Sequence, residues 1–183
     1  MIDWIYSLDF SILNWIQENL RCDFLDVVLV FITKLGNGGI VWIALSVVLL
    51  CFKKYRKTGV LMLASLAFGL LLGELLLKHI VARMRPFTHV TGMELLVTAP
   101  GSYSFPSGHS WSSFTSATIL LFTDKRIGIP AVILAALIAF SRMYLYVHFP
   151  SDVLVGSLCG VLTGLLAVWM MKQIQKRQEH SLS

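Results

Sequence analysis

The sequence predicts an all-α fold, a polytopic transmembrane helical bundle of five to six membrane helices with an N-terminal amphipathic segment. Hydrophobic residues make up 56% of the 183 residues and charged residues only 14%, against roughly 45–50% and 25% in ordinary soluble domains. A soluble domain of this size could not bury so much apolar surface, which excludes a cytosolic enzyme. The net charge of +5 does not indicate a nucleic-acid partner, because many of the cations flank apolar runs.

Five apolar runs are candidates to cross the bilayer, since a helix needs about 20 mostly apolar residues to span its core. They cover residues 38–52, 59–80, 107–123, 129–147 and 152–171. We expect a single domain over residues 1–183, organised as interfacial helices (1–35), a transmembrane bundle (36–172) and a cytoplasmic tail (173–183).

The first 35 residues form amphipathic rather than spanning patterns. Apolar side chains recur on one helical face, at Ile5, Leu8, Ile12, Trp15 and Ile16, and three polar ones fall off it, Asp9, Asn14 and Glu18. This predicts a helix that lies in the membrane interface. Residues 22–33 are too short to span the bilayer, so we expect a shallow or re-entrant helix that ends near Gly36, with a sixth crossing as the alternative.

The connectors between the runs fall into two kinds. Residues 53–57, 124–126 and the tail from Lys172 are basic, whereas residues 83–106 and 148–151 are richer in Pro, Gly, Ser and His. Because Lys and Arg beside short loops favour the cytoplasmic side, we expect the C-terminus inside and the second set of connectors outside.

Three polar segments fall on this expected outer side. In the first, Lys78 and Arg85 lie two helical turns apart and Pro86 stops the helix. Basic residues at a helix end commonly snorkel, but two cations on one face would also hold an anion. Glu74, one turn before Lys78, could supply part of that charge.

The second segment, residues 106–109, begins an apolar run with Pro106, Ser107, Gly108 and His109. Pro and Ser are ordinary at a helix start. The free amides there also bind anions, glycine permits close approach of a phosphate, and a histidine could donate a proton.

The third segment places Arg142 and His148 at the outer end of one run and Asp152 at the start of the next. Pro150 breaks the helix between them, so His148 and Asp152 should meet across a tight turn. An aspartate beside a histidine fixes its tautomer and leaves the other nitrogen free for attack, although a helix-capping Asp and an interfacial His would account for the same residues.

Together these segments offer three cations, two histidines and one carboxylate, without an Asp/Glu cluster for a metal ion. The set suits a phosphate that is bound by cations and attacked by histidine, so we expect no metal and no cofactor.

These residues resemble the three signature motifs of the type 2 phosphatidic acid phosphatase (PAP2) superfamily. The matching positions are Lys78, Arg85 and Pro86, then Pro106, Ser107, Gly108 and His109, then Ser141, Arg142, His148 and Asp152. Within the superfamily the chain is similar to short forms of the bacitracin-resistance type of undecaprenyl diphosphatase, although that type often carries Asp where this chain has Gly108.

The resemblance implies a metal-independent phosphatase of the cell membrane, with the site at the outer face. It makes His148 the nucleophile that forms a phosphohistidine, Asp152 the residue that orients it, and His109 the acid that protonates the departing oxygen. It assigns phosphate binding to Lys78, Arg85, Ser107, Gly108 and Arg142.

The expected partners are the bilayer and a membrane lipid phosphate, with undecaprenyl diphosphate as the first hypothesis and phosphatidylglycerophosphate or phosphatidate as the second. A small lipid or anion transporter is the alternative from another class, although transport has no need of a His–Asp pair beside a second histidine. The sequence indicates no oligomeric state.

Overall fold

The computed structural model describes residues 2–180, and every regular element in that range is helical. The α-helices are α1 (Ile2–Leu20), α2 (Asp23–Gly36), α3 (Ile40–Cys51), α4 (Arg56–Gly69), α5 (Lys78–Val81), α6 (Gly108–Thr123), α7 (Lys125–Tyr144) and α8 (Pro150–His180). Three shorter elements join them, the 3₁₀ turns η1 (Asn37–Gly39) and η3 (Pro86–His89) and the π-helical η2 (Leu70–Leu77). The predicted all-α fold is confirmed. The last three residues of the predicted tail lie outside the described residues.

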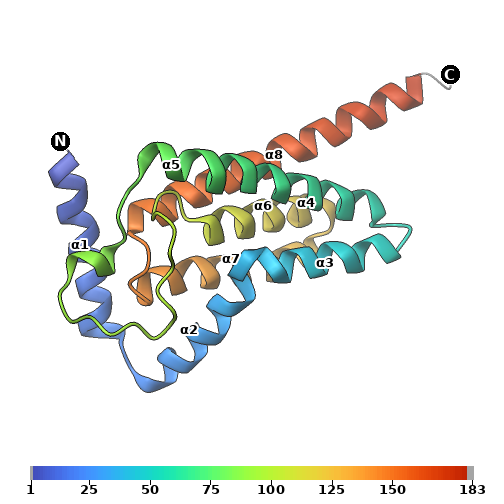
Figure 1. Cartoon of the computed structure of the whole chain (residues 1–183). Coiled ribbons are helices and arrows are strands. Elements are labelled where there is room, and N and C mark those ends of the chain that lie inside the picture. The colour runs from blue at the N-terminus through green and yellow to red at the C-terminus, as the bar shows by residue number, and fades with distance from the viewer. Residues whose placement is uncertain (1, 181–183) are drawn as a thin grey trace.

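Helix α6 forms the centre of the bundle and packs mainly on α7 and α8 (Figure 1). Glycines at 156, 160 and 164 share one face of α8, because a spacing of four returns to the same side of a helix. A Cβ at Gly160 would lie 2.5 Å from the carbonyl oxygen of Trp111. These small residues therefore let α8 approach the backbone of α6, as in other membrane bundles.

The expected five to six spans are wrong, because four helical segments within residues 2–180 are long and apolar enough to cross a membrane. They are Asp23–Cys51, Arg56–His89, Lys125–Tyr144 and Pro150–Gln178. The run at 107–123 is not one of these candidate spans, because α6 has only 16 residues. It is also rich in buried Ser and Thr, which suits a helix surrounded by protein better than one facing lipid.

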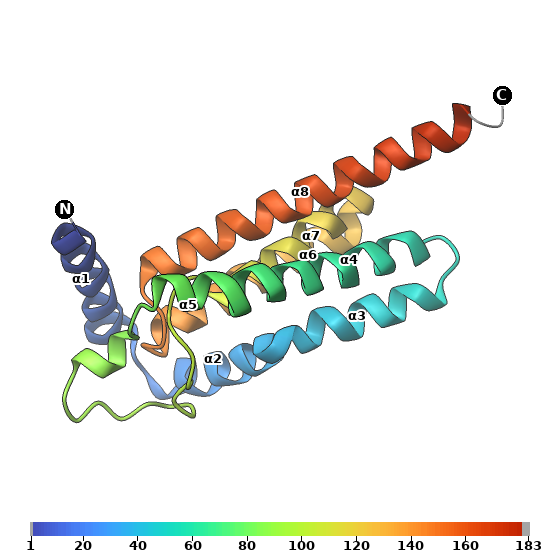
Figure 2. The same cartoon turned by 45° about the horizontal axis from the view of Figure 1, so that its top comes forward.

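The runs at 22–33 and 38–52 belong to one kinked segment. Helix α2 ends at Gly36 as expected, but the chain continues through η1 into α3, and the two helices follow one another along the bundle (Figure 2). Gly38 and Gly39 take φ values of 58° and 69° at the kink, a left-handed conformation that glycine adopts without steric cost.

Helix α1 runs across the end of the bundle where α8 begins (Figures 1 and 2). Its large apolar side chains Trp4, Leu8 and Trp15 are exposed, while Leu13 is fully buried. Asp9, which lies off the predicted apolar face, is 2% exposed because the opposite face of α1 packs on the bundle. This leaves an apolar face free, as an interfacial helix requires.

Candidate active site

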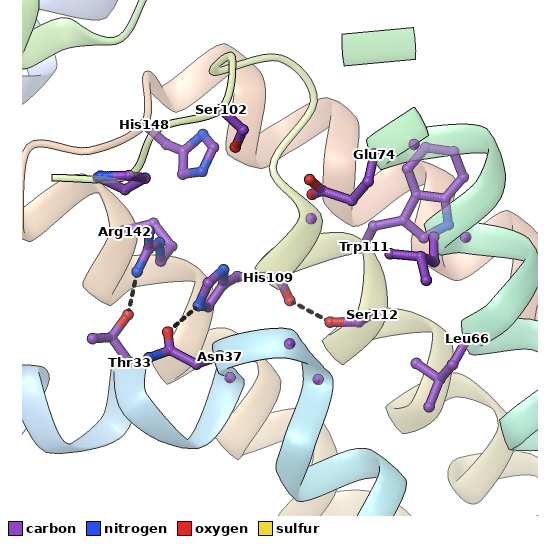
Figure 3. A pocket seen from close by; sticks show the side chains of 18 of the residues that line it. Thr33, Asn37, Leu66, Glu74, Ser102, His109, Trp111, Ser112, Arg142 and His148 are labelled. Carbon is purple, nitrogen blue, oxygen red and sulfur yellow. Dashed lines mark hydrogen bonds between the residues drawn. The ribbon is translucent and has the colours of Figure 1, made fainter. Parts of the chain in front are cut away.

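A cavity of about 920 Å³ opens between α2, α4, η2, α6 and α7 at the end of the bundle near α1. Six of the eight predicted site residues line it, namely Lys78, Arg85, Gly108, His109, Arg142 and His148. Figure 3 shows Arg142, His109 and His148 together on one side, with Glu74 across from them. The structure therefore brings all three sequence segments to one place.

Lys78 and Arg85 reach the cavity by different routes. The predicted continuous helix through both is wrong, because α5 ends at Val81 and Ala82 has a φ of 49°. Arg85 extends from the irregular segment that follows. Lys78 Nζ and Arg85 Nη2 nevertheless each donate to Ser102 Oγ at 3.1 Å, so the loop before α6 draws the two cations together.

Arg142 is 4% exposed and lies near the end of α7. Its Nη1 donates to Thr33 Oγ1 of α2 at 2.6 Å, and its Nε has no hydrogen-bond partner. A buried guanidinium with an unpaired donor is costly, and an anion in the cavity would satisfy it. The unpaired Nε of this cavity-lining arginine is consistent with an anion site.

His148 lies in the turn between α7 and α8 and is 1% exposed. Arg85 Nη1 lies 3.1 Å from its Nε2. Because a guanidinium can only donate, Nε2 is the acceptor and neutral His148 carries its proton on Nδ1. Burial and the neighbouring cations of Arg85 and Arg142 hold the pKa of His148 well below its ordinary value, which keeps Nε2 unprotonated.

Asp152 stands behind His148 and is fully buried. Its Oδ2 lies 3.6 Å from His148 Nδ1 and accepts hydrogen bonds from Ser104 Oγ and from the Phe149 backbone N–H. Helix α8 begins at Pro150, so the two residues meet across a turn as predicted. The 3.6 Å separation makes this an electrostatic contact, longer than a hydrogen bond.

His109 occupies the first turn of α6, and its Nε2 lies 2.9 Å from Asn37 Oδ1 of η1 (Figure 3). Gly36 makes room for the ring, since a Cβ there would lie 2.7 Å from His109 Cδ2. The kink between α2 and α3 therefore both admits and orients this histidine.

Glu74 is the one carboxylate among the residues that line the cavity. Its Oε2 lies 2.9 Å from Lys78 Nζ, and its side chain reaches the α-carbon side of Gly108 at the start of α6. Lys78 and a helix N-terminus are where an anionic substrate would bind. Glu74 thus occupies an anion's place in this structure, on a π-helical segment of the kind often found at functional sites.

Ser107 is the one predicted phosphate ligand whose side chain does not face the cavity. It is fully buried, and its Oγ accepts from the Ser110 backbone N–H at 3.4 Å and from Ser110 Oγ at 3.0 Å. The hydroxyl therefore serves as the N-cap of α6, the ordinary function of a serine at this position.

Several polar residues of the site lie outside the three motifs, and sequence reasoning missed them. They are Thr33, Asn37, Ser102, Ser104 and Arg83, together with Asp9 on α1. All except Asp9 contact a motif residue directly, and Asp9 contacts Arg83 and Ser151. These partners come together only in the folded chain, so no local spacing marks the residues. Within residues 2–180 there is no group of three or more His, Cys, Asp or Glu placed to hold a metal ion.

Comparison with protein families matches residues 58–176 to the PAP2 superfamily, a range that contains all three motifs. The chain belongs to the PAP2 superfamily. It is an integral membrane phosphatase of that superfamily, which acts on lipid phosphates.

Two curated relatives and a crystal structure support this membership over most of the chain. An undecaprenyl-diphosphatase of Sulfolobus acidocaldarius is 39% identical over 145 residues, which are 79% of this chain and 69% of the relative. The undecaprenyl-diphosphatase BcrC of Bacillus subtilis is 30% identical, over 78% of this chain and 72% of its own. The crystal structure of a PAP2-type phosphatidylglycerolphosphate phosphatase from Bacillus subtilis superposes with a TM-score of 0.76 at 30% identity, and covers 93% of this chain and 87% of its own.

Proposed function

We propose that this phosphatase hydrolyses a polyprenyl diphosphate, with undecaprenyl diphosphate as the first candidate, through a phosphohistidine on His148. The observation that most supports this is the joint presence of His109 and His148 in one cavity with the cations of Lys78, Arg85 and Arg142. Two undecaprenyl-diphosphatases among the relatives support the choice of lipid.

In the proposed reaction, Nε2 of His148 attacks the terminal phosphorus. The new N–P bond forms as the bond from phosphorus to the leaving oxygen breaks. Burial and the neighbouring cations lower the pKa of His109, so His109 takes up its proton when the anionic substrate offsets those cations, and it donates that proton to the leaving oxygen. The proton on Nδ1 of His148 stays there, and Asp152 stabilises the positive charge that develops on the ring. Water then attacks the phosphohistidine and gives a proton to His109, which releases inorganic phosphate and restores both Nε2 and the acid.

The cations supply the electrostatic part of catalysis. Charge spreads over the phosphoryl oxygens in such a transition state, so preorganised donors lower its energy. Lys78, Arg85 and Arg142 are each at most 4% exposed, where charges are poorly screened and act strongly. Gly108 would add the backbone amide of the α6 N-terminus.

The part of the cavity wall formed by α3, α4 and η2 fits a lipid tail. Its side chains are apolar, namely Ile43, Leu63, Leu66 and Leu70. A polar end with three cations and an apolar extension match a lipid whose head group carries phosphate.

Phosphatidylglycerophosphate is the second candidate substrate. Phosphatidylglycerophosphatase B of Bacillus subtilis is 30% identical over 86% of this chain, a larger share than the 79% and 78% matched by the two undecaprenyl-diphosphatases.

A substrate panel with purified protein in EDTA distinguishes these candidates. We expect undecaprenyl diphosphate to be hydrolysed with the highest kcat/KM, and acid-labile ³²P from a terminally labelled substrate to be trapped on the protein. His148→Ala should abolish trapping, whereas His79→Ala, an exposed histidine outside the cavity, should retain it. Loss of all activity in EDTA, or trapping by His148→Ala, would refute the mechanism.

We also propose that the site faces the outer side of the cell membrane and that the C-terminus is cytoplasmic. The support is the charge of the connectors, since the basic segments 53–57, between α3 and α4, and 124–126, between α6 and α7, lie at the bundle end opposite α1 (Figure 1). Lys172 of α8 lies on the same side, over the ring of Phe122 near the end of α6.

A further inference from the structure

Arg83 is a buried cation that lies outside the phosphate cavity. Its side chain is 10% exposed, with Nη1 2.6 Å from Asp152 Oδ1 and Nη2 2.7 Å from Asp9 Oδ2. The guanidinium also stacks over the ring of Phe149, 4.0 Å from its centroid. One arginine therefore joins two buried carboxylates, of which one stands beside His148 and the other belongs to α1.

Asp9 connects α1 to the first turn of α8 by hydrogen bonds. Its Oδ1 accepts from the Ser151 backbone N–H at 2.9 Å, and its Oδ2 accepts from Ser151 Oγ at 2.6 Å. The Ser151 amide is one of the donors that a helix start leaves without a partner, and a negative charge is favourable there. Asp9 thus stabilises the start of α8, which contains Asp152 and directly follows His148.

The two oxygens of Asp152 have separate partners. Arg83 binds Oδ1, while Oδ2 accepts from Ser104 and the Phe149 amide and faces His148 Nδ1. Without Arg83, Oδ1 would lose its charged partner and the carboxylate plane would be less strongly fixed. Because Asp9 also binds Arg83, one guanidinium is paired with two carboxylates and neutralises each only in part. The remaining negative charge of Asp152 can then stabilise the imidazole of His148.

We propose that Asp9 and Arg83 are positioning residues of the phosphatase, which hold Asp152 in the orientation that aligns His148, so that α1 takes part in catalysis without touching the substrate. This inference rests on the proposed function, in which Asp152 stabilises His148 during phosphoryl transfer. Neither Asp9 nor Arg83 lines the cavity, so their effect should fall on the chemical step and not on lipid binding.

Asp9→Asn tests the proposal, because it keeps the shape of the side chain and removes its charge. We expect kcat and the rate of ³²P trapping to fall about 10- to 100-fold, the range seen when outer hydrogen-bond partners of a site are removed, with KM unchanged. Glu18→Gln, an exposed acidic residue of the same helix, is the matched control and should keep the wild-type kcat. All rates are expressed per folded protein, measured by size-exclusion chromatography.

A double-mutant cycle with Arg83→Gln separates positioning from a general loss of stability. If both residues act through Asp152, the double variant should be little slower than the slower single variant, whereas independent effects would add. Arg83→Lys keeps the buried charge but cannot bridge both carboxylates, so we expect it to recover only part of kcat. If Asp9→Asn does not fold, Arg83→Lys provides the same comparison of kcat with KM.

The possible results distinguish this inference from the function on which it rests. A wild-type protein inactive on every lipid phosphate would overturn the proposed function. An active wild type whose Asp9→Asn variant keeps full kcat, or whose KM alone changes, would overturn only the positioning role.

Discussion

His109 and His148 line the same cavity but are held in opposite ways, and this difference can be measured. His148 faces a guanidinium through Nε2, whereas His109 faces the amide oxygen of Asn37. If His109 protonates the leaving oxygen, its loss should matter most when that oxygen is strongly basic. General acid catalysis contributes typically 10²- to 10⁴-fold.

We therefore predict that His109→Ala lowers kcat more on an alkyl phosphate monoester than on a lipid diphosphate, whose leaving phosphate is the weaker base. Steady-state kinetics on both substrate types measures the ratio. An equal loss on the two substrates would contradict the role of His109 as the general acid.

Glu74 supports a second prediction at the residue scale. Its carboxylate pairs with Lys78 at the cavity wall, so a phosphate that binds Lys78 must compete with it. We predict that Glu74→Gln lowers the inhibition constant of inorganic phosphate several-fold, because the competing charge is gone. Inhibition kinetics measures this, with Glu94→Gln in the loop outside the cavity as control, and unchanged inhibition would show that Glu74 does not compete.

The sequence predicted the residues that line the cavity much better than the residues that hold these side chains in place. Lys78, Arg142 and His148 could be found because phosphate chemistry requires cations and a nucleophile at short spacings within the motifs. Asp9 and Asn37 could not, because each is an unremarkable polar residue until the fold places it against a partner more than 70 positions away, Arg83 for Asp9 and His109 for Asn37. Ser107 is a motif residue whose hydroxyl caps α6, the alternative that its place at a helix start already offered.

At the scale of elements, the apolar runs predicted where helices form but not how many of them cross the membrane. A run of apolar residues does not distinguish a helix that faces lipid from one buried by its neighbours, and α6 is of the second kind. Nor did the apolar pattern predict that α2 and α3 form one kinked segment. The glycines at 36, 38 and 39 are equally compatible with the end of a short helix and with a kink. The kink they form places Gly36 and Asn37 against His109.

Gly36 tests that dependence. It ends α2 in a right-handed helical conformation that alanine also adopts, so Gly36→Ala introduces no backbone strain. The added Cβ would lie 2.7 Å from His109 Cδ2 and 2.8 Å from Ile138 Cγ2, and the histidine ring would have to move. We predict a loss of kcat of about tenfold or more and a stability cost of about 1–3 kcal/mol from overpacking.

The control for Gly36→Ala is Gly101→Ala, where an added Cβ has nothing within 4 Å. That variant should keep both kcat and the melting temperature. If Gly36→Ala were as active as Gly101→Ala, close packing of α2 on His109 would not be required for catalysis.

At the scale of the whole molecule, burial of a neutral His148 links folding to pH. Its pKa lies well below the ordinary value in the folded state, mainly because of burial, and is about 6.5 in the unfolded chain. The unfolded state therefore binds more protons below pH 6.5, so the stability present above that pH declines as the pH falls. One such group costs up to about 1.4 kcal/mol per pH unit.

We predict that the melting temperature in detergent falls between pH 7 and pH 5, and that His148→Gln reduces this slope. Thermal unfolding at closely spaced pH values measures both. Identical slopes in the two proteins would show that His148 is already protonated in the folded state at these pH values.

Orientation in the membrane is a property of the entire bundle, and two native cysteines can report it. Cys22 precedes α2 at the cavity end, and Cys51 ends α3 at the opposite end of the same candidate span. Both are exposed, while Cys159 lies partly buried in α8. In intact cells, an impermeant maleimide should label a variant whose single cysteine is Cys22. A variant whose single cysteine is Cys51 should react only after the membrane is opened.

The reverse pattern would place the phosphate cavity on the cytoplasmic side, and the orientation predicted from the basic connectors would then be wrong. Because the two thiols lie at opposite ends of one segment, equal labelling of both variants in sealed cells would instead show that residues 23–51 do not cross the bilayer.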